Sequence, residues 1–324
     1  MSYFLIIGGF ILLLLGAEIM LRGAIGIAEK FGISKFVVGM TIVAFGTSAP
    51  ELLVSLNAVL SGSSGLAIGN VVGSNIANIL LVLGIAGLLM PIPIEPGVFK
   101  RDGWMLIAGT GLFAALALSG EITTFGGLAL LVYFVGFLLY SYVREKKGLD
   151  AAGEAYEYDV DEIDGIPQKF LKILVYLVIG FAGLIYGADI LVQGCVAIAK
   201  SFGVSEAVIG LTVVAFGTSL PELAATIVAA IRKHSDVAIG NIVGSNIFNV
   251  VGVIGVVGVI TPLDVPSRII NFDVWIMLAA SLILMPYMIG RRDRLGRVEA
   301  LLFLAAYLIY IGAIGYGVET LIPV

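Results

Sequence analysis

The chain has 324 residues, of which 60% are hydrophobic and only 13% are charged, and its net charge at pH 7 is −5. A soluble domain carries about 25% charged residues, so this composition excludes a soluble globular protein and indicates one that crosses a membrane several times. The chain has one cysteine and one histidine, which excludes an intrachain disulfide and a metal site built from His and Cys side chains.

Ten apolar segments reach the length of about 20 residues that a helix needs to cross a membrane. They lie near residues 3–28, 36–61, 65–90, 103–119 and 122–143 in the first half, and near 170–199, 205–231, 236–260, 272–290 and 297–318 in the second. We therefore predict an all-α polytopic membrane protein with ten transmembrane helices.

A polar segment over 144–169 separates the two sets of five spans and holds eight acidic residues between Glu145 and Asp164. We interpret it as a solvated linker. The alternative is an acidic calcium sensor, but the segment lacks the ligand spacing and the glycine of an EF-hand. We thus predict three parts, namely five helices over 1–143, the linker over 144–169 and five helices over 170–324.

The two halves of the chain repeat each other at an offset of 171 residues. Eleven of sixteen residues are identical between 36–51 and 207–222, and ten of thirteen are identical between 67–79 and 238–250. Because five is an odd number of spans, the second half must enter the membrane from the opposite side. We therefore predict two inverted repeats, related by a pseudo-two-fold axis in the plane of the membrane.

Lysine and arginine residues indicate the orientation, because they concentrate in the cytoplasmic loops of membrane proteins. With the N-terminus outside, fifteen of them fall in the inner connections, whereas only Lys200 and Arg268 fall in the outer ones. We predict a multi-pass protein of the cell (inner or plasma) membrane with both termini outside and a cytoplasmic linker. The first span contains Glu18 at the position that Asp189 has in the second half, so we interpret this span as part of the repeat rather than as a signal peptide.

The first repeated motif is Gly46-Thr-Ser-Ala-Pro-Glu51, which returns as Gly217-Thr-Ser-Leu-Pro-Glu222. Proline lacks an N–H group and clashes with the carbonyl four residues earlier, so each helix should bend or open here. In lipid, the freed carbonyl needs protein, water or an ion as its partner. A carboxylate inside the membrane is energetically unfavourable unless it is neutralised. Two of them in broken helices therefore predict a cation site near the membrane midplane, where the repeats meet. A packing kink between small residues is the alternative.

Neutral oxygen atoms near the two glutamates could complete such a site. Backbone oxygens are available from Ala44, Ala215, Thr47 and Thr218, and hydroxyl oxygens from Thr47, Thr218, Ser48 and Ser219. The second repeated motif adds polar stripes, because residues four apart share one helix face. The stripes are Asn70, Ser74 and Asn78 in the first copy and Asn241, Ser245 and Asn249 in the second. The glycines of this motif could equally serve close helix packing.

The two glutamates together carry two negative charges, which one Ca²⁺, two Na⁺ or two protons would cancel. Moving a bare ion out of water costs several kcal/mol, so the site must always be neutralised and suits competition between ions. Ca²⁺ accepts six to eight oxygens in loose geometry, whereas Mg²⁺ demands a tight octahedron, so a flexible cage favours Ca²⁺.

A second pair of acids, Glu18 and Asp189, occupies matched positions in the first span of each half. Arg22 follows Glu18 by one helical turn and can pair with it, whereas Gln193 has that position after Asp189. We interpret both acids as structural or vestibule residues rather than as ligands of a transported ion.

The repeated Gly-Thr-Ser-x-Pro-Glu and Gly-Asn-x-Val-Gly-Ser-Asn-Ile-x-Asn motifs resemble those of the cation/calcium exchanger superfamily, and most of all the prokaryotic sodium/calcium exchangers. The resemblance implies alternating access, in which the first and sixth helices slide over a core of the second, third, seventh and eighth. It implies an antiporter, not an enzyme, that exchanges about three Na⁺ for one Ca²⁺ and is electrogenic. The implied partners are the transported Na⁺ and Ca²⁺ and membrane lipid, with no nucleic acid and no organic cofactor, and a monomer could suffice.

Carried over by motif position, the resemblance implies ligands for each ion. For Ca²⁺ they are Glu51 and Glu222 with the backbones of Thr47 and Thr218. For Na⁺ they are the same glutamates with Ser48, Ser219, Ser74 and Ser245 and the carbonyls of Ala44 and Ala215. Both halves carry asparagine, at Asn78 and Asn249, whereas some members, including potassium-dependent ones, have aspartate at the position of Asn249. This departure disfavours K⁺ co-transport, and it leaves only two charged groups for three sodium ions.

Three other functions compete with Na⁺/Ca²⁺ exchange. A H⁺/Ca²⁺ antiporter could use the same scaffold, since burial favours protonation of a carboxyl group, but the hydroxyl groups of the motif favour Na⁺. A cation channel could use the acidic residues for selectivity, but broken helices in inverted repeats favour alternating access. An intramembrane hydrolase would need a base near Ser48 or Ser219, and no histidine lies within the spans.

Overall fold

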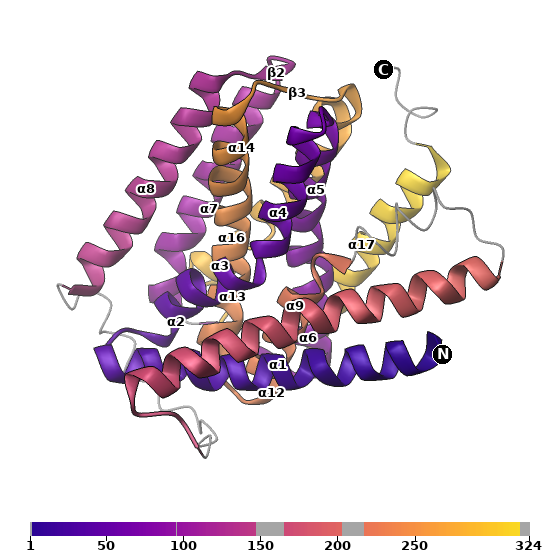
Figure 1. Cartoon of the computed structure of the whole chain (residues 1–324). Coiled ribbons are helices and arrows are strands. Elements are labelled where there is room, and N and C mark those ends of the chain that lie inside the picture. Colours follow the sequence, from indigo (N-terminus) through magenta and orange to yellow (C-terminus); the bar gives the residue numbers. More distant parts are fainter. Residues whose placement is uncertain (1, 95, 147–164, 203–216, 318–324) are drawn as a thin grey trace. The chain divides into compact units, whose positions relative to one another are not determined.

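The computed structural model describes residues 2–94, 96–146, 165–202 and 217–317. Two compact units divide the chain: Met1–Pro50 with Glu157–Asn241, and Glu51–Tyr156 with Ile242–Val324. Both units are helical, and each contains segments from both sequence repeats (Figure 1). The compact units therefore follow tertiary contacts rather than the boundary between the repeats, and the predicted three-part division of the sequence stays a prediction.

The first unit is built around two long helices, α1 (Ser2–Phe31) and α9 (Phe170–Ser201). The shorter elements are α2 (Lys35–Val38), the π-helical segment η1 (Gly39–Val43), α3 (Ala44–Thr47) and α12 (Leu220–Ile231). The boundary between the two units falls inside two further helices, after Pro50 in α4 (Ala49–Leu60) and after Asn241 in α13 (Ser235–Ile247). The core of this unit contains Leu13, Met20, Leu184 and Ala224, all almost fully buried.

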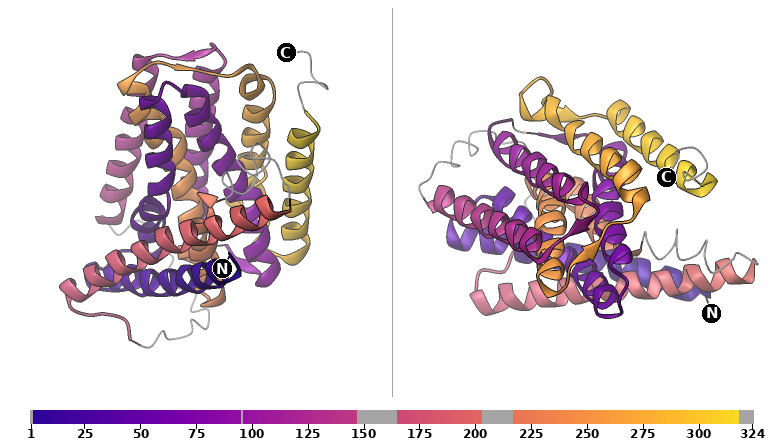
Figure 2. Two further views of the ribbon diagram at one scale, coloured as in Figure 1. Left: turned by 45° about the vertical axis from the view of Figure 1, so that its right-hand side comes forward. Right: turned by 90° about the horizontal axis from the view of Figure 1, so that it is seen from above.

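Helices α1 and α9 run antiparallel and side by side (Figures 1 and 2). Glycines recur every seven residues on both helices, at positions 9, 16 and 23 of α1 and at 180, 187 and 194 of α9. A Cβ atom added at Gly16 would lie 2.6 Å from the backbone nitrogen of Leu184, and one added at Gly180 would lie 2.5 Å from that of Met20. The glycines therefore allow the two backbones to touch, as small residues do between helices in membranes.

The second unit contains the remaining elements. From the first repeat they are α5 (Ser64–Ala77), η2 (Asn78–Val82), α6 (Leu83–Leu89), β1 (Ile92–Pro93), α7 (Pro96–Ala117), β2 (Glu121–Ile122) and α8 (Thr124–Lys146). From the second repeat they are η5 (Phe248–Val253), α14 (Ile254–Ile260), β3 (Leu263–Asp264), η6 (Ile269–Asp273), α15 (Val274–Leu282), α16 (Met285–Met288), β4 (Arg294–Leu295) and α17 (Arg297–Tyr316).

Helices of the two repeats pack on each other inside the second unit, α8 on α14 and α6 on α17. Two antiparallel pairs of two-residue strands add to these contacts. Strand β1 pairs with β4, with Ile92 opposite Leu295, and β2 pairs with β3, with Ile122 opposite Leu263. These short ladders were not predicted, because two residues are too few to produce a strand pattern in the sequence.

Seven helices in the described part of the chain are long and apolar enough to cross a membrane, or eight if the bent pair Lys35–Thr47 and Ala49–Leu60 forms one span. The prediction of a helical polytopic membrane protein is confirmed at this level. Two predicted spans are not among these helices. Helix α7 carries charged residues at 100–102, in its first two turns, and of the span expected at 205–231 only 217–231 are described.

Candidate functional site

The Pro-Glu motif breaks the helix in the first repeat, as its sequence predicts. Helix α3 ends at Thr47, α4 begins at Ala49, and the two helical segments that meet at Ser48 are bent by 43°. Ser48 has φ −87° and ψ 7°, and Ser219 has nearly the same backbone angles, φ −85° and ψ 1°, directly before α12. Proline is tolerated because it lies in the first turn of the new helix, where its missing N–H costs nothing.

The break places both glutamates at equivalent positions. Glu51 is the third residue of α4 and Glu222 is the third residue of α12, and both side chains are fully buried. The unpaired N–H groups at the start of a helix carry a partial positive charge that stabilises a nearby carboxylate. Each helix break thus creates an environment in which a buried negative charge is tolerated.

In the first unit, Glu222 contacts the helix break of the other repeat. The hydroxyl of Ser48 donates to Oε1 of Glu222 at 2.6 Å, and the hydroxyl of Thr47 donates to Oδ1 of Asn241 at 3.1 Å. The Asn241 amide in turn donates to the hydroxyl of Thr226 at 3.1 Å. Two separate sets of buried hydrogen bonds therefore join the first motif of one repeat to both motifs of the other.

In the second unit, Glu51 contacts the second motif of its own repeat. The hydroxyl of Ser74 donates to Oε1 of Glu51 at 3.3 Å. The Asn70 amide donates to the backbone oxygen of Glu51 at 3.2 Å and to the hydroxyl of Ser55 at 3.1 Å. The predicted stripe of Asn70 and Ser74 therefore lies against the glutamate.

Both copies of the second motif lead into a π-helical segment. Segment η2 begins at Asn78, and segment η5 contains Asn249. Single π-turns inside α-helices are frequent at functional sites. The Asn78 amide donates to Oδ1 of Asn246 at 3.1 Å, and the Asn75 amide donates to the backbone oxygen of Asn246 at 3.0 Å. The repeats thus also meet at their asparagines within the second unit.

Several buried polar atoms of these motifs have no hydrogen-bond partner among the described residues. They are both amide atoms of Asn249, Oδ1 of Asn78, Oδ1 of Asn75, the amide nitrogen of Asn246 and the hydroxyl oxygen of Ser219. Leaving a buried polar atom without a partner costs about 1–3 kcal/mol, so such atoms normally have a ligand or a water. The oxygens among them are chemically suited to a cation.

The predicted site residues divide between the two units. In the first unit lie Ala44, Thr47, Ser48, Thr218, Ser219 and Glu222, and in the second lie Glu51, Ser74, Asn78, Ser245 and Asn249. Thr218 is half-buried and the others are buried, whereas Ala215 lies outside the described residues. The Ala44 carbonyl accepts hydrogen bonds from the Ser48 N–H at 3.0 Å and the Thr47 hydroxyl at 3.3 Å. A single site that contains both glutamates stays a prediction.

Sequence reasoning missed Ser55 and Thr226, the hydroxyl partners of Asn70 and Asn241. A signal was present, because the two residues are 171 apart and each follows its glutamate by four residues, on the same helix face.

It also missed a third pair of repeated acids, Asp102 and Asp273, in the sequences Asp-Gly-Trp and Asp-Val-Trp 171 residues apart. Both side chains are buried, and each has an arginine partner. Arg101 donates to Asp102, and Arg268 donates to Asp273 at 2.9 Å. Their ion pairs indicate a structural role in the second unit rather than a ligand role.

The acids of α1 and α9 have different partners. Glu18 accepts from Arg22 at 2.9 Å, as predicted, and also from Arg232, at the end of α12, at 2.9 Å. Asp189 accepts from the side-chain amide of Gln193 at 2.8 Å.

Known proteins resemble this chain over nearly its full length. Residues 1–143 and 172–315 match the family described as sodium/calcium exchanger protein. The chain is 38% identical to the putative antiporter CaxA of Alkalimonas amylolytica over 304 residues, which are 93% of this chain and 95% of that protein. It is 33% identical to the sodium/calcium exchanger MaX1 of Methanosarcina acetivorans over 346 residues, covering 97% of this chain and 99% of that protein. A solved structure of the sodium-calcium exchanger NCX_Mj, soaked with zero Na⁺ and Ca²⁺, superimposes with a TM-score of 0.82 at 31% identity, covering 97% of this chain and 98% of that one.

Proposed function

Because this chain belongs to the sodium/calcium exchanger protein family, we propose that it is a secondary active antiporter that exchanges Na⁺ for Ca²⁺ across a membrane. Members of this family are exchangers rather than enzymes. Na⁺ and Ca²⁺ are therefore the substrates of this chain, and it needs no organic cofactor. The observation that carries the proposal is the buried hydrogen bond from Ser48 in one repeat to Glu222 in the other.

We propose that Glu51 and Glu222 hold one Ca²⁺ between them. The connectivity of the chain supports this proposal. The Ser48 hydroxyl donates to Glu222, and the Cα atom of Glu51, the third residue after Ser48, can lie at most about 10 Å from the Cα atom of Ser48. Both carboxylates are buried at the starts of helices, where a dication would balance their two charges. A cage of carboxylates, hydroxyls and carbonyls suits the loose coordination of Ca²⁺.

The same atoms can serve Na⁺. The proposed ligands are the two glutamates, the four serines Ser48, Ser219, Ser74 and Ser245, the amide oxygens of Asn78 and Asn249, the backbones of Thr47 and Thr218, and the carbonyls of Ala44 and Ala215. A serine that donates to a carboxylate can rotate its hydroxyl hydrogen away and present a lone pair to Na⁺ instead. About three Na⁺ replacing one Ca²⁺ would move one net charge per cycle, which makes the exchange electrogenic.

The proposed architecture has ten transmembrane helices in two inverted repeats, over 1–143 and 170–324, that work by alternating access. The interleaving of the repeats inside each unit supports an arrangement in which both repeats build one transport path. Both termini would face outward from the cell membrane, with the linker over 144–169 in the cytoplasm and a single copy sufficient for transport.

Vesicle flux tests the coupling ion. The purified chain is reconstituted, and Ca²⁺ uptake is measured with an outward Na⁺ gradient while the proton gradient is collapsed. We expect uptake that depends on internal Na⁺. Because one net positive charge leaves the vesicle in each cycle, uptake should accelerate when the vesicle interior is made more positive. Uptake driven only by a pH gradient would overturn the sodium proposal, and single-channel currents would overturn exchange altogether.

A H⁺/Ca²⁺ antiporter is the second candidate. Asparagine at both Asn78 and Asn249 leaves two carboxylates in the motifs, a charge that two protons would neutralise as well as two Na⁺. The same vesicles, with Na⁺ absent and a pH gradient imposed, distinguish this candidate from the first.

A further inference from the structure

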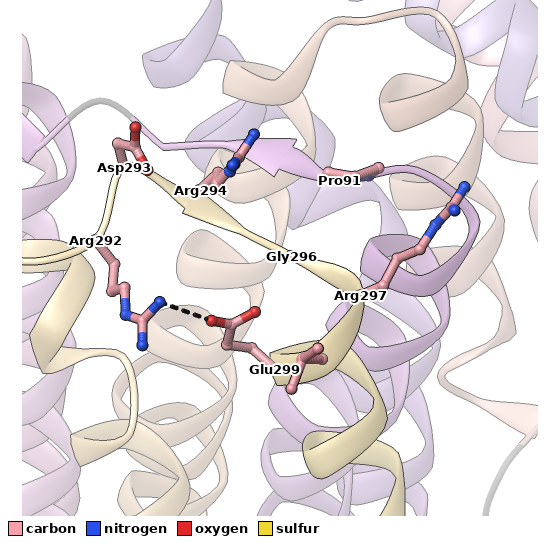
Figure 3. A pocket seen from close by; sticks show the side chains of 8 residues that line it. Pro91, Arg292, Asp293, Arg294, Gly296, Arg297 and Glu299 are labelled. Carbon is pink, nitrogen blue, oxygen red and sulfur yellow. Dashed lines mark ion pairs between the residues drawn. The ribbon is translucent and has the colours of Figure 1, made fainter.

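A basic pocket of about 420 Å³ lies at the β1–β4 ladder in the second unit, outside the repeated motifs (Figure 3). Its charged lining consists of Arg292, Arg294, Arg297, Asp293 and Glu299. Three arginines and two acids leave the pocket with one net positive charge. The sequence predicts that this connection faces the cytoplasm.

The charges of the pocket are not all available to a ligand. Arg292 forms an ion pair with Glu299 at 3.1 Å, which Figure 3 marks. The Glu299 carboxylate also lies over Gly296, since a Cβ atom there would be 2.8 Å from its Oε2. Gly296 is the residue before α17, so Glu299 supplies the negative charge that the start of this helix favours. This pair and the helix terminus are therefore already neutralised.

Arg294 and Arg297 remain, and neither forms an ion pair with any residue in the described ranges. Their backbones are fixed, because Arg294 is paired with Pro93 in the ladder and Arg297 is the first residue of α17. In Figure 3 both side chains extend away from the Arg292–Glu299 pair, Arg294 from β4 and Arg297 from the start of α17, with Pro91 between them. The guanidinium group donates in a planar fork that matches phosphate oxygens, so two such groups favour a phosphate.

An exposed apolar stripe begins at the same pocket and follows α17. Val298 lines the pocket and is 70% exposed, and further along the helix Leu302 is 62% exposed and Ile309 is 72% exposed. A free phosphate would have no use for this stripe, whereas the acyl chains of a lipid would cover it. The arginines and the stripe together fit a molecule with an anionic head and apolar tails.

We propose that the pocket binds the phosphate of an anionic phospholipid, with Arg294 and Arg297 on the phosphate and the acyl chains along α17. A phosphodiester carries one negative charge, which matches the net charge of the pocket. Basic pockets at the cytoplasmic ends of transmembrane helices are suited to such headgroups. The proposal depends only on a membrane location and does not need the ion coupling to be known.

The test uses the purified full chain in nanodiscs that contain equal amounts of phosphatidylglycerol and phosphatidylcholine. Native mass spectrometry then measures which lipid stays bound after release. We expect enrichment of phosphatidylglycerol in the wild type and a loss of about fivefold for Arg294→Gln or Arg297→Gln, the effect expected of one arginine near an anionic surface. Arg291→Gln removes the same charge next to the pocket without lining it, so it should keep the enrichment.

Three outcomes would overturn the proposal. They are unchanged enrichment in both pocket variants, an equal loss in Arg291→Gln, and displacement of the lipid by inorganic phosphate at millimolar concentration. If a glutamine variant does not fold, Arg294→Lys and Arg297→Lys decide, because lysine keeps the charge but loses the fork. We expect at least a twofold loss in these variants, and no loss would contradict phosphate binding by the guanidinium groups.

Discussion

The two copies of the Pro-Glu motif have kept the same local structure, whereas the acids of α1 and α9 have acquired different surroundings. Ser48 and Ser219 share their backbone angles, and Glu51 and Glu222 are both fully buried in the first turn of a helix. At the same sequence offset, Glu18 is held by two arginines and Asp189 by one amide.

The two pairs of acids differ in whether the same local structure is needed in both repeats. The proposed single ion, bound by both repeats, would require equivalent ligands from each, which accounts for the glutamate, proline and serine found in both motifs. An acid that only anchors its helix can use whichever partner lies nearby, which is Arg232 for Glu18. Matched substitutions in the two repeats test this distinction.

The largest expected effect is that of Glu51→Gln and Glu222→Gln. Each should lower Ca²⁺ transport in reconstituted vesicles by at least about a hundredfold, because removing one partner from a group of buried, mutually compensating charges costs about 3–5 kcal/mol. The two variants should be equally inactive if the site is symmetric. Glu121→Gln, at an exposed residue of strand β2, is the control and should transport normally. Wild-type flux in either site variant would exclude that glutamate as a ligand.

Ser48→Ala and Ser219→Ala should differ when ions are absent. The Ser48 hydroxyl donates to Glu222, and a hydrogen bond to a charged group contributes about 1.5–3 kcal/mol, so Ser48→Ala should lower the free energy of unfolding by about that amount. The Ser219 hydroxyl has no hydrogen-bond partner among the described residues, so Ser219→Ala should change it little. Thermal unfolding in ion-free buffer measures both. Equal losses would mean that the two serines are equivalent in that state.

Glu18→Gln and Asp189→Asn test the divergent pair. Glu18→Gln removes a half-buried carboxylate that two arginines share, and we expect a loss of about 1 kcal/mol, since Arg22 and Arg232 are partly exposed. Asp189 is exposed, and among the described residues its one side-chain partner is Gln193. Asp189→Asn should therefore change the free energy of unfolding by no more than about 0.5 kcal/mol. Chemical unfolding of both variants decides, and a larger loss for Asp189→Asn would reverse the comparison.

The smallest effect on overall rate should come from Asn249→Asp. It adds a third carboxylate near the proposed ions, so the dependence of Ca²⁺ flux on pH and on Na⁺ concentration should change, while transport persists. Protons compete with cations for carboxylates, so flux should fall as the pH is lowered, and more steeply in this variant. Asn78→Asp is the matched variant in the other repeat, and an unchanged profile in both would place these asparagines away from the ions.

The sequence predicted the parts of the fold that depend on local chemistry. Hydropathy gave the helices, proline gave the break at Ser48, and the spacing of four residues gave the pair of Glu18 and Arg22. The π-helical turns at Asn78 and Asn249 were missed, because hydrophobic periodicity does not distinguish a single wider turn. Partners distant in the chain were also out of reach, as Arg232 is 214 residues from Glu18.

For the candidate site, the duplicated motifs were sufficient to identify the polar residues but not their contacts. The bond from Ser48 to Glu222 links residues 174 apart, and nothing in either motif indicates which serine meets which glutamate. Asp102 and Asp273 could have been found from the 171-residue offset alone. Their burial was not evident, because Asp102 directly precedes one predicted span and Asp273 lies at the start of another, where an acid near an arginine is expected to face water.

The glycine contacts between α1 and α9 have a mechanical consequence. Where backbone touches backbone, no side chain can switch rotamer to let one helix slip past the other, and prising them apart would leave an empty gap along both. We therefore expect the two helices to move as one rigid body, so that a displacement of α1 also displaces α9.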